Sequence, residues 1–421
     1  MQYELTYQKE EWSDMKYVVL VGDGMADRPL KELGNKTCLQ KADTPHMDKL
    51  AAEGEVGTAR TVPDGFEPGS DVANLSILGY NPSKYYSGRA PIEAIYRGIP
   101  LGEKDVAFRC NLVTLNMDYN DAARMEDYSA GHISTKDART LIRELDKRLG
   151  TEEIRFYPGM SYRHLMVWKN GKDKMHCTPP HDISGKKVEG YLPGGRGSEV
   201  LRSLMIRSRE ILLSNSVNSA RMKKGLRPAN SIWFWGQGRK LSLPLFQEKY
   251  NLKGALISAV DLTKGLGMSA GFDIVHVKGA TGYIDTNYTG KARAALNALK
   301  TYDIVYVHVE APDEAGHNGD LRAKLQAIED FDKKVVGPVM DGVKRFGEFS
   351  IMLMPDHFTP IRVKTHVADP VPFVIFRSTA SGRGTGFHAH AYSESICRMK
   401  KKLLFERGYR LMDYFVRRVR T

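Results

Sequence analysis

The chain has 421 residues, of which 42% are hydrophobic, 9% aromatic and 27% charged, a composition typical of a globular protein with two or three domains. This balance excludes intrinsic disorder, a collagen-like repeat and a coiled-coil rod, and no apolar run is long enough to span a membrane. The formal net charge of +12 raises the question of nucleic-acid binding.

The cysteines and the N-terminal stretch favour a reducing, cytoplasmic location. The four cysteines, Cys38, Cys110, Cys177 and Cys397, are scattered without a CxxC pair. Neither a disulfide framework nor a zinc framework is therefore expected. The first fourteen residues carry charged side chains and no apolar run, so we expect no secretory signal.

Both ends of the chain alternate apolar runs with helical patterns. Buried strands are predicted at 16–23, 303–309, 350–354 and 372–376. Helices are predicted at 45–54, 291–299 and 321–336. This alternation indicates an α/β domain whose mostly parallel sheet is sandwiched by helices.

The middle of the chain has a different pattern. Short strands are predicted at 108–115, 164–168 and 231–235, separated by Gly- and Pro-rich loops. We therefore predict a smaller α+β domain, residues 106–254, inserted into the α/β domain. The larger domain would comprise residues 1–105 and 255–421.

The C-terminal segment carries much of the positive charge. Residues 398–421 hold nine Lys and Arg against two acidic residues, with Leu403, Leu404, Leu411, Met412 and Phe415 at roughly helical spacing. This pattern favours a surface helix with a solvated basic face. A nucleic-acid patch is the alternative, but the segment lacks interleaved aromatic residues and a known binding motif.

Carboxylates and imidazoles follow or flank the predicted strands. In an open parallel sheet, ligands bind beyond the carboxyl ends of the strands. Four separate segments bring such side chains to that edge: Asp23, Asp313 with His317, Asp356 with His357, and His366. Asp313 and His317 share one face if their segment begins a helix. Mixed carboxylate and imidazole ligands suit Mn²⁺, Zn²⁺ or Mg²⁺, so we predict a metal site.

Ser70 is the candidate nucleophile. It follows Gly69 and opens a predicted helix, where free N–H groups can hold an anion. A hydroxyl bound to a divalent cation is partly deprotonated and becomes a usable nucleophile. The alternative is that Ser70 only caps the helix.

Longer runs surround these positions. They are VGDGMADRP, ADTPHMDKLAAEG, PGSDVANLSILGY, YYSGRAPIEA, EDYSAGHIS, SYRHLMVW, PPHDISGK, IWFWGQG, GATGYIDTNY, EAPDEAGHNGD, PDHFTP and HVADPVPFVIF. With these runs, from about Met15 to Gly408, the chain resembles the cofactor-independent phosphoglycerate mutases of the archaeal-type branch, in the alkaline phosphatase superfamily.

The resemblance implies an alkaline-phosphatase-like fold and a two-metal reaction. Ser70 would be the phosphorylated nucleophile, and 3-phosphoglycerate would become 2-phosphoglycerate without 2,3-bisphosphoglycerate. Two divalent cations are implied, usually Mn²⁺, with Mg²⁺, Zn²⁺ or Co²⁺ as alternatives. Their implied ligands are Asp23, Ser70, Asp356 and His357 for one ion and Asp313, His317 and His366 for the other.

The resemblance also implies that the inserted domain binds the glycerate. The candidate contacts are His132, Arg163, His181, Asp182, Arg221 and Lys264, with Arg89 as a further one. Arg side chains bind carboxylate and phosphate with a two-pronged fork, and His or Asp can transfer the hydroxyl proton. A structural or solvated role is the alternative for each of them.

Three functions remain to be distinguished. The first is a phosphoglycerate mutase of glycolysis and gluconeogenesis, an isomerase acting on a small molecule. The second is a phosphomonoester hydrolase on the same metal core, in which water attacks the phosphoserine. A large inserted domain favours the mutase, because transfer requires that water be excluded. The third is an inactive nucleic-acid-binding protein, which an intact ligand set argues against.

Overall fold

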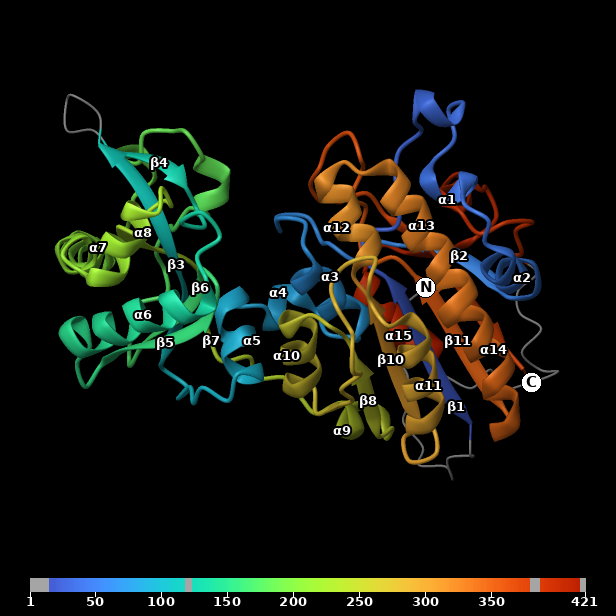
Figure 1. Cartoon of the computed structure of the whole chain (residues 1–421). Coiled ribbons are helices and arrows are strands. Elements are labelled where there is room, and N and C mark those ends of the chain that lie inside the picture. The colour runs from blue at the N-terminus through green and yellow to red at the C-terminus, as the bar shows by residue number, and fades with distance from the viewer. Residues whose placement is uncertain (1–14, 118–122, 379–386, 417–421) are drawn as a thin grey trace. The chain divides into compact units, whose positions relative to one another are not determined.

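The computed structural model describes residues 15–117, 123–378 and 387–416. The chain divides into two compact units (Figure 1). The first unit holds the described residues up to Tyr86 and those from Leu243 onward, and the second unit is Ser87–Ser242. None of the helices in the described residues has the length and apolarity needed to cross a membrane.

The unit boundaries differ from the predicted ones at 105/106 and 254/255. Helix α5 (Arg89–Tyr96) belongs to the second unit, because Ala90 and Ala94 pack against Ala107 and Leu165 of its sheet. Helix α9 (Phe246–Tyr250) belongs to the first unit, where the Phe246 ring lies 4.7 Å from the ring centroid of Phe272. The side chains that each short helix buries therefore determine its unit.

The first unit is built on an eight-stranded sheet, ordered β13-β2-β12-β11-β1-β10-β8-β9. Its strands are β1 (Lys16–Gly22), β2 (Glu55–Ala59), β8 (Gly254–Ile257), β9 (Asp273–Ile274), β10 (Ile304–Val309), β11 (Phe349–Met354), β12 (Val371–Arg377) and β13 (Leu403–Phe405). Strand β12 is antiparallel to both of its neighbours, and every other pairing is parallel. The central strand β1 reads as a continuous apolar run because both of its faces are covered.

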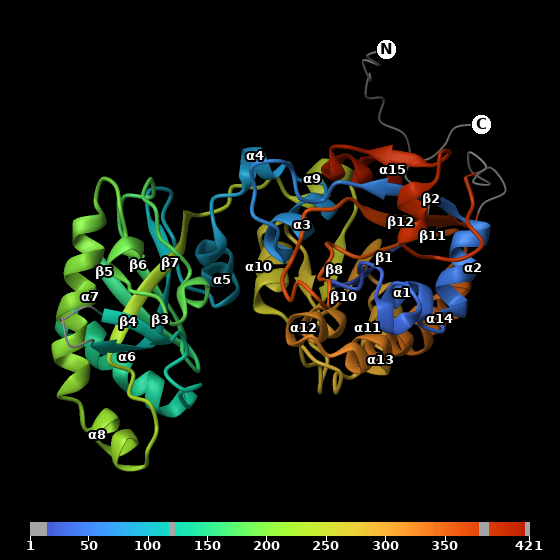
Figure 2. The ribbon, with the colours of Figure 1, turned by 90° about the horizontal axis from the view of Figure 1, so that it is seen from above.

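Helices lie on both faces of this sheet (Figure 2). They are α1 (Cys38–Lys41), α2 (Pro45–Glu53), α3 (Ser70–Ile77), α4 (Pro82–Tyr85), α9, α10 (Asp261–Ser269), α11 (Tyr288–Ala298), α12 (Ala311–Asn318), α13 (Leu321–Phe331), α14 (Gly337–Val343) and α15 (Leu411–Phe415). Helices α11, α13 and α14 cover one face and α15 the other, where the Phe415 ring lies 5.5 Å from that of Tyr17 on β1. The predicted helix at 321–336 continues past α13 as a π-helical turn, Asp332–Val336.

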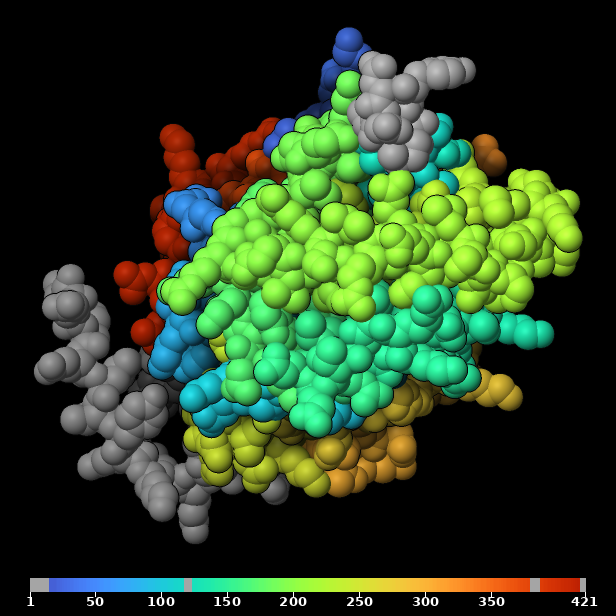
Figure 3. All heavy atoms as spheres, turned by 90° about the vertical axis from the view of Figure 1, so that its left-hand side faces the viewer, coloured from blue at the N-terminus to red at the C-terminus, as the bar shows by residue number. Residues whose placement is uncertain are grey.

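The second unit is a smaller α+β structure. Its five strands are β3 (Val106–Met117), β4 (Ala123–Asp127), β5 (Ile154–Met160), β6 (Arg163–Trp168) and β7 (Ser231–Arg239), all paired antiparallel. Its helices are α5, α6 (Thr135–Leu149), α7 (Ser198–Leu213) and α8 (Ser216–Lys223). Figure 3 shows the face of this unit that α6 and α7 cover. The mostly parallel sheet between helices and the separate α+β unit confirm the predicted fold class.

The predicted C-terminal basic helix is wrong for the described residues. Leu403 and Leu404 lie in β13, which pairs in parallel with the edge strand β2. Of residues 398–416, which the structure describes, only Leu411–Phe415 is α-helical, and Leu411, Met412 and Phe415 are buried. Residues 417–421 of the predicted helix lie outside the described residues.

Candidate active site

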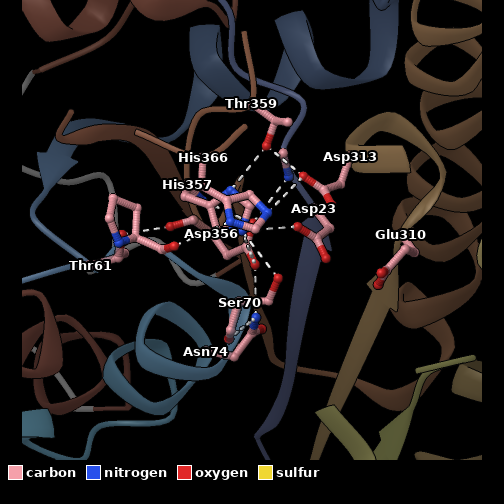
Figure 4. Close-up of polar contacts among 12 residues, drawn as sticks. Asp23, Thr61, Ser70, Asn74, Glu310, Asp313, Asp356, His357, Thr359 and His366 are labelled. Atoms are coloured by element: carbon pink, nitrogen blue, oxygen red, sulfur yellow. Dashed lines mark hydrogen bonds and ion pairs between the residues drawn. The ribbon is translucent and has the colours of Figure 1, made fainter. Parts of the chain in front are cut away.

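Six predicted ligand side chains meet at one edge of the first sheet (Figure 4). Asp23 directly follows β1, and Asp356 with His357 follows β11 after one intervening residue, Pro355. Helix α12, after β10, places Asp313 and His317 one turn apart on one face, as their spacing predicts. The parallel pairing of β1 with β10 and β11 brings these segments to the same edge.

His366 reaches this edge because β12 runs antiparallel to the rest of the sheet. The segment before β12 therefore lies where the parallel strands end. The backbone N–H of Val367 donates a 3.1 Å hydrogen bond to the carbonyl of Phe358, which ties this segment to the residue after His357. As a result, the His366 ring lies 4.2 Å from the His357 ring, measured between centroids.

The first ligand cluster contains Asp23, Asp356 and His357, all fully buried. His357 Nε2 is 3.4 Å from Asp23 Oδ1 and 3.5 Å from Asp356 Oδ2. Ser70, the first residue of α3, places its Oγ 3.1 Å from the same nitrogen. Four potential ligand atoms thus surround one point.

The second ligand cluster contains Asp313, His317 and His366. His317 Nε2 lies 3.2 Å from Asp313 Oδ2, and His366 Nε2 lies 3.6 Å from Asp313 Oδ1. The two imidazole Nε2 atoms are 2.9 Å apart. Two lone pairs at this separation repel, so the cluster requires a proton or a cation between them.

Neighbouring polar side chains hold these ligands in place. Asn74 donates 2.8 Å hydrogen bonds to Asp356 Oδ2 and to the carbonyl of Ser70, and it accepts one from the Tyr306 hydroxyl. The Thr359 hydroxyl donates to Asp313 Oδ1. These three supporting residues were not predicted from sequence, although Asn74 lies one turn after Ser70 and Thr359 two residues after His357.

Gly24 is required by the close approach of two segments. Its φ is +58°, its N–H donates to Asp356 Oδ1 at 3.1 Å, and a Cβ there would lie 2.4 Å from Asp313 Oδ1. The glycine thus lets the loop after β1 contact a carboxylate of each cluster.

The electrostatics of the site reflect crowded carboxylates. Burial and the carboxylates of Asp356 and Asp313 raise the pKa of Asp23 well above its ordinary value. Burial would also raise the pKa of Asp313, but hydrogen bonds with His317 and His366 bring it well below the usual range. Burial lowers the pKa of His357 to about 4, so its imidazole is neutral and able to act as a metal ligand.

The clusters fit divalent cations. Neither oxygen of Asp23 has a hydrogen-bond partner among the described residues, although both are buried. An unpartnered buried carboxylate is costly, and a bound cation removes that cost. Carboxylate oxygens, imidazole nitrogens and one hydroxyl form a ligand set suited to Mn²⁺ or Zn²⁺.

The second unit carries a separate exposed surface made of aromatic and basic side chains. His132, Arg163 and His181 lie on it and are solvent-exposed. The Arg163 guanidinium lies 5.3 Å from the centroid of the Tyr162 ring, and the His132 ring is 6.1 Å from the same ring. The His181 ring is 5.1 Å from that of Trp235. We call this the aromatic surface.

Two arginines that flank the aromatic surface share one carboxylate. Arg109 is buried, lies 4.2 Å from the Trp235 ring centroid, and places Nη2 3.2 Å from Glu93 Oε1. Arg89 Nε is 3.7 Å from the same Glu93 oxygen. Burial lowers the pKa of Arg109 to about 10, and the guanidinium still carries its charge at neutral pH. Arg109 was not among the predicted site residues, because it lies within the apolar strand β3.

Arg221 does not join this surface. It is 5% exposed, and its guanidinium donates to the backbone carbonyls of Ala130 and Arg227. These bonds hold the loop before His132, where Ala130 and His132 have φ values of 50° and 49°. Arg221 therefore supports this loop, and its contact with phosphate stays a prediction.

Asp182 and Lys264 lie in different units. Asp182 is exposed beside His181, with its Oδ1 3.5 Å from His181 Nε2. Lys264 is on α10 of the first unit, 7% exposed, with Nζ 3.3 Å from Asp261 Oδ1. Lys264 is therefore not part of the aromatic surface.

Comparisons with known proteins agree across the chain. Residues 51–218 match a family described as 2,3-bisphosphoglycerate-independent phosphoglycerate mutase. A Geobacter sulfurreducens protein named a probable member of that family is 53% identical over 405 residues, covering 96% of this chain and 100% of its own. A Methanosarcina barkeri mutase of the same name is 56% identical over 366 residues, covering 86% of this chain and 91% of its own.

Two solved structures share the fold. A Pyrococcus horikoshii protein is 28% identical, with a TM-score of 0.78 over 95% of this chain and 96% of its own. A cofactor-independent phosphoglycerate mutase from Thermoplasma acidophilum is 26% identical, with a TM-score of 0.63 over 95% of this chain and 98% of its own.

Proposed function

Because the chain belongs to the 2,3-bisphosphoglycerate-independent phosphoglycerate mutases, we propose that it interconverts 3-phosphoglycerate and 2-phosphoglycerate through a phosphoserine at Ser70. It is thus an isomerase acting on a small phosphorylated acid. The observation that carries the proposal is the position of Ser70 Oγ, 3.1 Å from His357 Nε2 at the edge where both ligand clusters meet. A cytoplasmic location, where this metabolite is found, is part of the proposal.

Two divalent cations, most simply Mn²⁺, are part of this proposal. Asp23, Ser70, Asp356 and His357 would hold one, and Asp313, His317 and His366 would hold the other. When bound, the cations would lower the pKa of the serine hydroxyl and neutralise charge on the phosphoryl oxygens.

The reaction consists of two displacements on one phosphoryl group. Ser70 Oγ, its proton lost, bonds to the phosphorus of 3-phosphoglycerate as the bond from phosphorus to substrate O3 breaks, and O3 takes up a proton. The 2-hydroxyl of the retained glycerate then loses its proton and attacks the phosphoserine, which releases Ser70 Oγ. No group is gained or lost overall, so 2,3-bisphosphoglycerate is not required.

Ser70 is well placed for this chemistry. As the first residue of α3, it lies beside the free N–H groups of a helix N-terminus, which favour a phosphoryl anion. Asn74 fixes both the Ser70 carbonyl and Asp356, so the nucleophile and a ligand carboxylate are held by one amide. This rigidity keeps the oxygen in position for attack.

The aromatic surface is the proposed glycerate-binding surface. Arg163, with Arg89 and Arg109, offers guanidinium groups to the carboxylate or phosphate of the substrate. His181 and Asp182 are the groups that would transfer the hydroxyl proton.

An enolase-coupled assay tests the proposal. Purified protein is given 3-phosphoglycerate and Mn²⁺ without 2,3-bisphosphoglycerate, while a parallel assay measures free phosphate. We expect 2-phosphoglycerate with little phosphate release, and loss of turnover in Ser70→Ala with unchanged thermal unfolding. Phosphate release without isomerisation would contradict the mutase and establish a phosphomonoester hydrolase.

A further inference from the structure

A fully buried lysine lies behind the two ligand clusters. Lys324, on α13, has its ammonium 3.0 Å from the carboxylate of Asp27, which is also buried. Taking both charges out of water is costly, and an apolar pair of similar volume often stabilises a fold equally well. The pair therefore needs an explanation other than stability, and the remaining contacts of Lys324 provide one.

Lys324 connects two loops of the sheet edge. Its ammonium donates hydrogen bonds to Asp27 Oδ2 at 3.0 Å, to the carbonyl of Thr359 at 2.7 Å and to the carbonyl of Ala26 at 3.4 Å. An ammonium has three N–H donors, so these contacts use all of them. Ala26 and Asp27 lie in the loop after β1, and Thr359 lies in the loop after β11. One side chain thus holds together the loops that supply the first ligand cluster.

The Asp27 carboxylate is itself held by the backbone of both loops. Its Oδ1 accepts a 2.8 Å hydrogen bond from the N–H of Arg28. The N–H of Ile361, in the loop after β11, lies 3.3 Å from Oδ2 and 3.4 Å from Oδ1. The Asp27 N–H donates to Glu394 Oε1 at 2.8 Å. Because a satisfied buried network is rigid, the counter-charge of Lys324 has a fixed position.

Thr359 relates this network to both ligand clusters. Its hydroxyl donates to Asp313 Oδ1, in the second cluster, and lies 3.2 Å from His357 Nδ1, in the first (Figure 4). Its N–H donates a 3.2 Å hydrogen bond to the carbonyl of Ala26. Thr359 is fully buried, so the position of its hydroxyl depends on where its main chain is held.

The hydrogen bonds of Thr359 also select one form of His357. A carboxylate only accepts hydrogen bonds, so the single hydroxyl proton of Thr359 is used on Asp313. The hydroxyl oxygen then accepts from His357 Nδ1–H, which leaves a free lone pair on Nε2. Nε2 is the atom that faces the other ligand atoms of the first cluster.

We propose that Lys324 is a positioning residue for both cation sites. It holds the main chain of Thr359, whose hydroxyl orients Asp313 and selects the tautomer of His357. Among the described residues, the hydrogen bonds of Lys324 Nζ go to Asp27 and to two backbone carbonyls, so it acts through other groups. The inference rests on the proposed function for the presence of the cations.

A paired substitution tests the proposal without leaving a buried charge unpaired. In Asp27→Asn/Lys324→Met, the amide oxygen can still accept the two backbone N–H groups, so we expect a folded protein. Asp341→Asn/Lys344→Met removes an exposed pair, 2.8 Å apart on the same unit, and is the matched control. Mn²⁺ binding is measured without substrate, from the electron paramagnetic resonance signal of the free ion. Thermal unfolding is measured on metal-free protein.

The paired substitution should weaken metal binding while the fold persists. We expect the Mn²⁺ dissociation constant to rise by about 10- to 100-fold, which is typical when a group that orients metal ligands is lost. At saturating Mn²⁺, kcat for 3-phosphoglycerate should fall with KM near the wild-type value, because the proposed glycerate-binding surface lies on the second unit. The control should match the wild type in every measurement.

Thr359→Val tests the path from Lys324 to the ligands. It keeps the buried ion pair and removes only the hydroxyl, so it should also weaken Mn²⁺ binding. Combined with Asp27→Asn/Lys324→Met, it should add little, because both changes break the same path. Additive effects would contradict the path through Thr359.

Wild-type Mn²⁺ affinity in the folded Asp27→Asn/Lys324→Met protein would overturn the proposal. Circular dichroism identifies a variant that fails to fold. In that case Thr359→Val decides: weaker Mn²⁺ binding supports the proposal, and unchanged binding contradicts it. A wild type that binds Mn²⁺ but does not isomerise 3-phosphoglycerate would refute the proposed function alone. A wild type that binds no Mn²⁺ would overturn both.

Discussion

The sheet edge of the first unit and the aromatic surface of the second unit both gather charged side chains, but they differ in burial and in pairing. At the sheet edge, Asp23, Asp356 and His357 are fully buried, and both oxygens of Asp23 lack hydrogen-bond partners among the described residues. On the aromatic surface, Arg163 is exposed and stacks on Tyr162.

This difference suits the two regions to the different ligands proposed for them. Crowded buried carboxylates need positive charge from outside the chain, so the sheet edge is complete only with cations. Exposed guanidinium groups that pack against aromatic rings need no added positive charge and can bind an anion. The predictions below test this distinction, from the largest expected effect to the smallest.

Metal removal should have the largest effect. Chelation of the purified protein should lower mutase activity by at least about 10³-fold, because cation stabilisation of phosphoryl transfer is worth several kcal/mol. Mn²⁺ should restore it. Hydrogen exchange should increase at the loops after β1 and β11, with the second unit unchanged. Full activity in metal-free protein would contradict the claim that the sheet edge needs cations.

Arg163→Ala should lower kcat/KM for 3-phosphoglycerate by about 10- to 100-fold, because charge-assisted hydrogen bonds to the substrate anion are lost. Metal stoichiometry should not change. Arg143→Ala, which removes an exposed arginine from α6 of the same unit, is the control and should match the wild type. If Arg163→Ala and Arg143→Ala had the same kcat/KM, Arg163 would not be part of the proposed glycerate-binding surface.

Arg221→Met distinguishes support of the loop from substrate contact. Losing these hydrogen bonds leaves the buried carbonyl of Ala130 and the partly buried carbonyl of Arg227 unpaired, so the free energy of unfolding should fall by about 2–4 kcal/mol. Arg207→Met, at an exposed position on α7, should have little effect. If Arg221→Met instead raised KM with unchanged stability, the residue would be a direct substrate contact.

Because of His164, the stability of the second unit should fall as the pH is lowered. Burial lowers its pKa from 6.5 to about 3, so below pH 6.5 the unfolded chain binds a proton that the folded chain excludes. Stability should therefore fall with decreasing pH by at most about 1.4 kcal/mol per unit between these values.

His164→Asn offers a matched test, because an amide oxygen can accept the Gly159 N–H that His164 Nδ1 accepts now. Denaturant unfolding followed by tryptophan fluorescence reports mainly on the second unit, which contains Trp168, Trp233 and Trp235 of the four tryptophans. The variant should lose less stability between pH 6.5 and 5. An identical loss in both proteins would exclude His164 as its origin.

The sheet edge was largely predictable from sequence, and the reason is geometric. Parallel strands with apolar runs deliver the residues after them to one edge, so Asp23, Asp356 and His357 could be grouped without coordinates. His366 could be included only loosely, because sequence does not reveal that β12 runs antiparallel.

The roles of residues in the second unit were harder to predict, because they depend on which groups the fold buries next to one another. Sequence shows that Arg221 is charged, but not that the carbonyls of Ala130 and Arg227 enclose it. Leu403 and Leu404 have helical spacing with Leu411, Met412 and Phe415, yet pairing with β2 makes them part of a strand. In both cases a tertiary contact overrides the local pattern.

Direct detection of the phosphorylated residue tests the central claim, that Ser70 carries the phosphoryl group during isomerisation. Wild-type protein with Mn²⁺ is mixed with 3-phosphoglycerate, quenched in acid within milliseconds and digested for mass spectrometry. We predict a phosphoryl group on the peptide containing Ser70, formed and lost at rates that support turnover. Isomerisation without that modification, or with the phosphoryl group on another residue, would contradict the claim.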